Sequence, residues 1–152
     1  MIVDAEVTIR GSRTAVWAVL ADLEHAATTF SGIEQIDILE RPIAGLVGLK
    51  WRETRILFGK PAAVEKWITE AAEPDYYSAR AESDGFIFIS TKRLSEHDGV
   101  LTLSESHESQ PQTLMARLQM IPMALFFKGT IRKAIMQDLN DLKSAVERQT
   151  SS

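Results

Sequence analysis

The chain has 152 residues, of which 45% are hydrophobic, 25% charged and 7% aromatic. These values are typical of a globular protein with one compact core and exclude a disordered or fibrous chain. A net charge of -4 argues against a general nucleic-acid-binding protein. Because the chain has no cysteine, disulfide scaffolds, thiolate zinc sites, iron–sulfur clusters and cysteine nucleophiles are excluded.

The start of the chain and its apolar stretches indicate a cytoplasmic protein. Asp4 and Glu6 stand where a secretory signal peptide has a basic region before an apolar run. The longest wholly apolar stretch, Met120 to Phe127, is interrupted by Pro122 and is far shorter than the ~20 residues of a membrane span.

The first part of the chain is expected to form a strand, a helical region and a second strand. Apolar and polar residues alternate from Val3 to Ile9, which is the period of a half-buried strand. Ser12 is a good N-cap, and the apolar spacing after it predicts a helix over about residues 13 to 24. Weaker helical character follows over 26 to 30, and alternation predicts a strand over 33 to 41.

In the middle of the chain, short alternating runs replace the helical period. Asp84-Gly85 and Asp98-Gly99 are strong signals of two-residue hairpin turns. Strands joined by such short connections pair antiparallel. The expected strands lie at about 47 to 58, 62 to 72, 76 to 83, 86 to 94 and 100 to 109.

The last part of the chain predicts a long amphipathic helix. Pro122 opens this helix at its first turn, or it kinks a longer helix that begins near Thr113. Asp138 is assigned to the polar side of the helix, away from the apolar face. The apolar face is formed by Ile131, Ile135, Leu139, Leu142 and Val146.

The order of elements predicts an α+β fold, because the helices are segregated from the strands in sequence. We expect a seven-stranded curved antiparallel sheet wrapped around the long C-terminal helix, with two short helices between strands 1 and 2. Residues 1–148 would form a single domain and residues 149–152 a polar tail. A ligand would occupy the space between the sheet and the terminal helix.

Four segments carry a resemblance to a known superfamily: Ser12 to Glu24, Phe30 with Ile33, Gly48 to Glu53, and Ile131 to Lys143. On these segments the chain resembles the START-like, or polyketide-cyclase/dehydrase-like (SRPBCC), superfamily, whose fold is called the helix-grip. The resemblance covers nearly the whole chain and implies that fold. Members bind lipids, sterols, hormones, quinones or polyketides, and only some are enzymes, so the resemblance implies no single function.

One face of the strand at 47 to 58 places charges among apolar side chains. Glu53 and Arg55 share this face with Leu49, Trp51 and Leu57. An inward Arg55 needs a partner, which is Glu53, another acid or a ligand carboxylate. The alternative is that the strand twists outward near its end and both charges are solvated.

His107 is the best candidate for a general base, because an imidazole exchanges protons near neutral pH. It shares a face with Leu101, Leu103 and Glu105, and Glu105 or Glu53 would orient it. A surface or structural histidine is the alternative. His97 falls in a hairpin turn and is expected to be solvated.

Neither a metal site nor a cofactor site is expected. The three histidines are widely spaced, and the sequence contains no His-x-x-x-His motif, clustered carboxylate loop or phosphate-binding glycine loop. A hydrolase has no support either, because no Gly-x-Ser-x-Gly motif is present.

The segment Met115 to Gly129 is apolar, and no acid occurs between Glu108 and Asp138. It is a lid over the pocket, part of the ordinary core, or a surface that touches an anionic bilayer. Transient membrane contact would involve Met120, Phe126, Phe127 and Lys128.

The most consistent function is binding of a small, largely apolar ligand of the lipid, quinone, polyketide or aromatic type. The expected polar anchors are Glu53, Arg55 and His107. The expected walls are Trp17, Trp51, Phe88, Leu103, Met123, Phe127 and Ile131. Two alternatives remain: a cyclase, dehydratase or isomerase in which His107 or Glu53 moves protons, and a module that docks a protein or a membrane.

Overall fold

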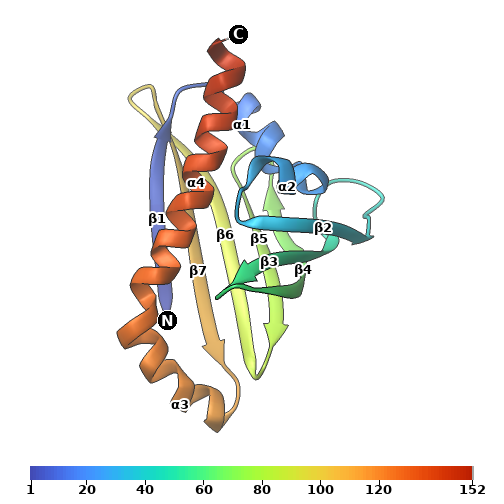
Figure 1. Cartoon of the computed structure of the whole chain (residues 1–152). Coiled ribbons are helices and arrows are strands. Elements are labelled where there is room, and N and C mark those ends of the chain that lie inside the picture. The colour runs from blue at the N-terminus through green and yellow to red at the C-terminus, as the bar shows by residue number, and fades with distance from the viewer. Residues whose placement is uncertain (152) are drawn as a thin grey trace.

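The computed structural model describes residues 1–151 and shows a seven-stranded sheet with a long helical segment across it (Figure 1). The strands are β1 (Ile2–Ile9), β2 (Ile33–Glu40), β3 (Lys50–Leu57), β4 (Lys60–Ala72), β5 (Tyr76–Ser83), β6 (Phe86–His97) and β7 (Val100–Pro111). The helical elements are α1 (Arg13–Leu20), η1 (Leu23–His25), α2 (Ala26–Thr29), α3 (Leu114–Pro122), η2 (Met123–Phe127) and α4 (Lys128–Ser151).

The sheet has the order β1-β7-β6-β5-β4-β3-β2, and every neighbouring pair is antiparallel. Both predicted Asp-Gly turns are present, with positive φ at Asp84 and Gly85 and at Asp98 and Gly99. Positive φ at both central residues matches the twist of the flanking strands. The α+β fold expected from the sequence, with its short helices between the first two strands, is confirmed.

The first helical region is more broken than the continuous helix expected over 13 to 24. α1 begins after Ser12, whose side chain accepts a hydrogen bond from the amide of Ala15, and it ends at Leu20. At Asp22 the backbone leaves the helical conformation, and its carboxylate lies 3.0 Å from Nδ1 of His25. Aspartate favours such local hydrogen bonds over a helix interior, which explains the short turn η1 at this point.

The C-terminal helical segment begins at Leu114, directly after its N-cap Thr113, rather than at Pro122. The hydroxyl of Thr113 accepts a hydrogen bond from the amide of Ala116 at 3.0 Å and caps α3. Pro122 ends α3, because proline has no N–H with which to continue the ladder. A five-residue π-helical segment, η2, connects it to α4. Of the two starts that the sequence allowed, the longer and kinked helix is therefore the correct one.

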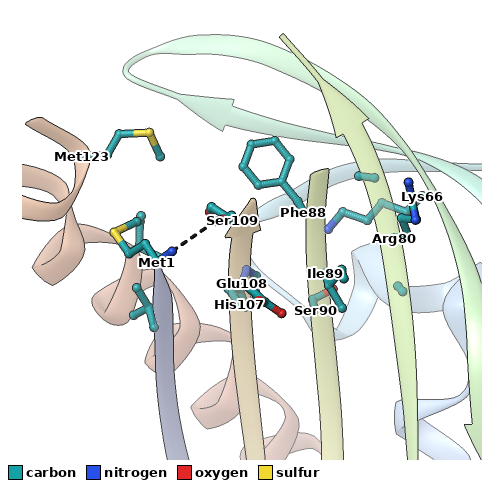
Figure 2. A pocket seen from close by; sticks show the side chains of 14 residues that line it. Met1, Lys66, Arg80, Phe88, Ile89, Ser90, His107, Glu108, Ser109 and Met123 are labelled. Carbon is teal, nitrogen blue, oxygen red and sulfur yellow. Dashed lines mark hydrogen bonds between the residues drawn. The ribbon is translucent and has the colours of Figure 1, made fainter. Parts of the chain in front are cut away.

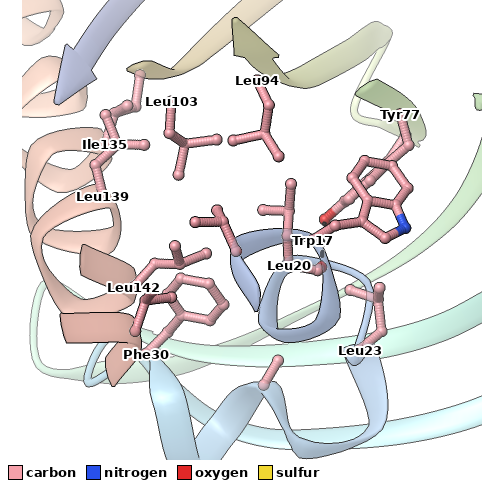
Figure 3. Packing of buried hydrophobic residues seen from close by; sticks show 14 of the residues in the cluster. Trp17, Leu20, Leu23, Phe30, Tyr77, Leu94, Leu103, Ile135, Leu139 and Leu142 are labelled. Carbon is pink, nitrogen blue, oxygen red and sulfur yellow. Dashed lines mark hydrogen bonds between the residues drawn. The ribbon is translucent and has the colours of Figure 1, made fainter. Parts of the chain in front are cut away.

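The main core lies between the upper half of α4, α1 and the sheet (Figure 3). Trp17 packs edge-on against Tyr77, with ring centroids 6.2 Å apart. Leu139 and Leu142 of α4 are fully buried against Leu103 of β7. These contacts hold α4 across the concave face of the sheet. Among the described residues, no helix combines the length and apolar composition required to cross a bilayer.

One residue of α4 is placed differently from its sequence assignment. Asp138, expected on the polar side, is only 7% exposed and faces the sheet. It lies three residues after Ile135 and four before Leu142, a spacing that belongs to the buried stripe of a helix. The position of Asp138 in the helix, rather than its charge, therefore determines that it faces the sheet.

Candidate functional site

The groove between the sheet and α4 has three zones along its length, and each long element contributes to all three. On β7, Leu101 and Leu103 belong to the core, Glu105 and His107 to a charged middle zone, and Ser109 to a cavity. β6 shows the same order, and α4 contributes residues to each zone. On β6, Leu94, Lys92 and Phe88 follow one another in this order. On α4, Leu139 and Ile135 belong to the core, Asp138 between them belongs to the charged zone, and Ile131 lines the cavity.

The cavity at the open end of the groove has a volume of about 190 Å³ (Figure 2). Its walls are largely apolar, and Met1, Phe88 and Met123 lie around its mouth. The amino group of Met1 donates a hydrogen bond to the carbonyl of Ser109 at 3.1 Å. The full lining is Met1, Val3, Lys66, Ala79, Arg80, Ala81, Phe88, Ile89, Ser90, His107, Glu108, Ser109, Met123 and Ile131.

A smaller cavity of about 30 Å³ lies directly behind it and shares Lys66, Ala79, Ser90 and His107 with the larger one. Its remaining lining includes the charged residues of the middle zone. The inner end of the apolar cavity therefore meets a buried polar network, which we call the charged floor: Glu53, Arg55, Lys66, Lys92, Glu105, His107 and Asp138.

Glu53 is the centre of one half of the charged floor. Its carboxylate accepts hydrogen bonds from Nε of Arg55 at 2.7 Å, Nζ of Lys66 at 3.1 Å and Nε1 of Trp51 at 3.3 Å. Burial raises the pKa of this carboxyl, but the attraction of Lys66 and Arg55 outweighs burial and lowers the pKa far below its usual value. Glu53 is therefore ionised at neutral pH.

Arg55 joins this half of the floor to α4. Its guanidinium donates two hydrogen bonds to Asp138, at 3.2 Å to Oδ1 and 2.8 Å to Oδ2, besides the one to Glu53. Burial lowers the pKa of Arg55, and the two carboxylates more than reverse that effect. A β-carbon at Gly32 would lie 2.8 Å from Nη1 of Arg55, so glycine leaves room for the guanidinium there.

Glu105 is the centre of the other half. It is 1% exposed, and its oxygens lie 2.8 Å from Nζ of Lys92 and 2.9 Å from Nε2 of His107. Burial raises the pKa of Glu105, but Lys92 and His107 lower it far below the usual value. The pKa of Lys92 is raised, because its pairing with Glu105 outweighs burial. Both partners are therefore charged at neutral pH.

The charged floor contains equal numbers of buried negative and positive groups. The three buried carboxylates of Glu53, Glu105 and Asp138 face the three cations of Arg55, Lys66 and Lys92. With His107 neutral, the floor carries no net charge. Such a network is stable only while each buried charge keeps its partner.

The structure brings together most of the residues that the sequence singled out. Phe88, His107, Met123 and Ile131 line the larger cavity, and Trp51, Glu53 and Arg55 line the smaller one with His107. Trp17 and Leu103 lie in the core and line neither cavity. Phe127 is 41% exposed and contacts Phe58 of the β3–β4 turn, with ring centroids 6.3 Å apart.

Sequence reasoning missed Lys66, Lys92, Asp138 and Ser90. The signal for Lys92 was available, because it occupies the same face of β6 as Phe88 and Leu94. Lys66 likewise precedes the buried Ile68 by two positions. A charged residue at an inward position of an alternating strand is the pattern that would have located both.

Exposed apolar side chains cover α3 and η2 beside the cavity. Leu125 and Phe126 are 72% and 74% exposed, whereas Met120 is half-buried. Met123 of this segment lines the cavity at its mouth, and the other residues of the segment lie largely outside the core. Membrane contact through Met120, Phe126, Phe127 and Lys128 stays a prediction.

Comparisons with known proteins identify the fold. No protein-family model matches the chain, and no curated protein matches it. TTHA0849 from Thermus thermophilus has a TM-score of 0.78 at 14% identity, over 98% of this chain and 99% of that one. A START superfamily protein from Mycobacterium smegmatis has a TM-score of 0.78 at 14% identity, over 97% and 98%.

A third solved structure, the Zhui aromatase/cyclase from Streptomyces sp. R1128, has a TM-score of 0.74 at 18% identity, over 99% of this chain and 95% of that one. At these identities the similarity shows the fold and not the function. The START-like helix-grip fold expected from the sequence is confirmed.

Proposed function

We propose that this START-like chain binds a small, largely apolar molecule of the lipid, quinone, polyketide or aromatic type between the sheet and α4. The observation that carries the proposal is the cavity of about 190 Å³, with apolar walls and a polar inner end. Ligand pockets combine many apolar walls with a few polar groups that fix orientation. The similar structures include a START superfamily protein and an aromatase/cyclase, which supports a ligand of this kind.

Filling the cavity should abolish ligand retention. Ser90 lines both cavities from β6, so Ser90→Leu places a larger side chain in the space where the ligand binds. We expect native mass spectrometry of the wild type to show a stoichiometric apolar adduct that is released on unfolding. In Ser90→Leu we expect its occupancy to fall at least tenfold.

The matched control is Ser95→Leu, the same change at an exposed position of the same strand. Ser95→Leu should retain the adduct at the wild-type level. A folded Ser90→Leu protein with full adduct occupancy would place the ligand elsewhere and contradict the proposal.

A second candidate function is an enzyme that moves protons, of the cyclase, dehydratase or isomerase type. It is favoured by His107, which reaches the cavity and is hydrogen-bonded through Nε2 to the buried Glu105. A base oriented by a carboxylate is the arrangement that proton abstraction requires.

A substrate-independent probe tests this activity. We expect the wild type to accelerate ring opening of 5-nitrobenzisoxazole, which proceeds by abstraction of one C–H proton and releases a coloured phenolate. His107→Phe should lose about 10² of that acceleration, the usual contribution of a general base. The surface change His97→Phe should have no effect, and equal rates in all three proteins would rule out His107 as a base.

A further inference from the structure

The cations of the charged floor are already committed to carboxylates of the protein. Arg55 donates to Glu53 and Asp138, Lys66 donates to Glu53, and Lys92 pairs with Glu105. At the rim of the cavity, Arg80 pairs with Glu82, and the Met1 amino group donates to a carbonyl. Among the lining residues within 1–151, the Met1 ammonium at the mouth is the one cation without a carboxylate partner, and no unpaired cation is left at the inner end of the cavity to neutralise an anionic ligand.

Unlike these cations, His107 can offer a ligand a hydrogen-bond acceptor. Nε2 lies 2.9 Å from Glu105, and an ionised carboxylate only accepts hydrogen bonds, so Nε2 carries the proton. In the neutral imidazole the other nitrogen, Nδ1, then keeps its lone pair as an acceptor. The side chain is 38% exposed and lines both cavities, so a bound molecule can reach it.

Ser90 stands directly opposite His107 across the β6–β7 ladder and lines the same cavities. Its hydroxyl both donates and accepts hydrogen bonds, so it adds a neutral polar contact without adding charge. The inner end of the cavity is therefore a neutral hydrogen-bonding site with one strong acceptor.

We propose that the cavity selects an apolar ligand that ends in a neutral hydroxyl donor, such as a phenol or an enol, which donates to Nδ1 of His107. This inference rests on the proposed ligand-binding function and specifies the chemistry of the ligand. A carboxylate is disfavoured at this place, because it would be desolvated without a cation to pair with.

The test uses three naphthalene probes of similar size: 2-naphthol, 2-methoxynaphthalene and 2-naphthoate. Isothermal titration at pH 7.5 should show 2-naphthol binding the wild type about tenfold more tightly than 2-methoxynaphthalene, the discrimination expected from one hydrogen bond in a buried site. Because the methoxy compound is the more apolar of the two, hydrophobicity alone predicts the opposite order. 2-Naphthoate should bind at least tenfold more weakly than 2-naphthol.

The variant His107→Phe keeps an aromatic ring at this position and removes the acceptor. It should lose the preference for 2-naphthol and bind 2-methoxynaphthalene at least as tightly, whereas His97→Phe should keep the wild-type preference. The ranking in the wild type tests the inference even where His107→Phe does not fold.

The outcomes separate this inference from the function on which it rests. Tightest binding of 2-naphthoate, or equal binding of the naphthol and its methyl ether to the wild type, would overturn the hydroxyl specificity and leave ligand binding intact. Failure of all three probes to bind would overturn the proposed ligand-binding function itself.

Discussion

Replacing Arg55 by leucine should lower the free energy of unfolding by about 3–5 kcal/mol, the usual cost of removing one partner from a buried ion pair. The change leaves the carboxylates of Glu53 and Asp138 buried, and Asp138 loses both of its hydrogen bonds to the guanidinium. Chemical denaturation at pH 7 measures the effect.

Arg52→Leu is the matched control on the same strand. Arg52 is exposed and pairs with Glu65 at 3.3 Å on the outer face of the sheet. An exposed pair contributes about 0–1 kcal/mol, so this variant should be nearly as stable as the wild type. In the double variant Arg55→Leu/Asp138→Leu we expect part of the lost stability to return, because the unpaired carboxylate is gone. Equal, small losses in Arg55→Leu and Arg52→Leu would show that the bonds to Asp138 contribute little.

Acid should destabilise the protein steeply below about pH 5. The pKa values of Glu53 and Glu105 are lowered in the folded state, whereas an unfolded glutamate titrates near 4.5. The stability from these groups is complete above the unfolded pKa, and it is lost as pH falls toward the folded values, because the unfolded chain then binds more protons. Each group contributes up to about 1.4 kcal/mol per pH unit.

Glu105→Gln tests whether Glu105 contributes to this dependence of stability on pH. Denaturation midpoints between pH 5 and 3 should fall less steeply in the variant, because one of the two groups no longer titrates. At pH 7 the variant should already be less stable by about 3–5 kcal/mol, since Lys92 remains buried without its carboxylate. Glu65→Gln, at an exposed position, should keep the wild-type slope. An unchanged slope in Glu105→Gln would mean that the acid sensitivity arises at other carboxyl groups.

Local patterns in the sequence were enough to predict the strands and turns. Alternation placed Glu53 and Arg55 on one face of β3 and left open whether they are buried or solvated, and the two Asp-Gly pairs located two hairpins. These features are determined by residues close together in the sequence, so sequence patterns predict them directly. A helix start near Thr113 was one of two predicted starts, because the competing start at Pro122 has an equally good local signal.

Pairing inside the charged floor could not be predicted in the same way. Arg55 and Asp138 are 83 residues apart and meet only because α4 crosses the sheet at that height. Lys66 reaches Glu53 through the register of β3 and β4, in which Glu53 stands opposite Val64 rather than Lys66. Which charges meet is therefore a property of the assembled sheet and helix and not of any one segment.

The π-helical segment η2 determines which side of the helix meets the cavity. Met123 and Ile131 both line the cavity, although they are eight positions apart. In a regular α-helix, at about 100° per residue, their directions would differ by about 80°. One extra residue in a π turn reduces the effective separation to about seven positions and the difference to about 20°. The irregular turn thus acts as a rotational correction that brings Met123 onto the inner face of the helix and leaves Phe126 turned outward.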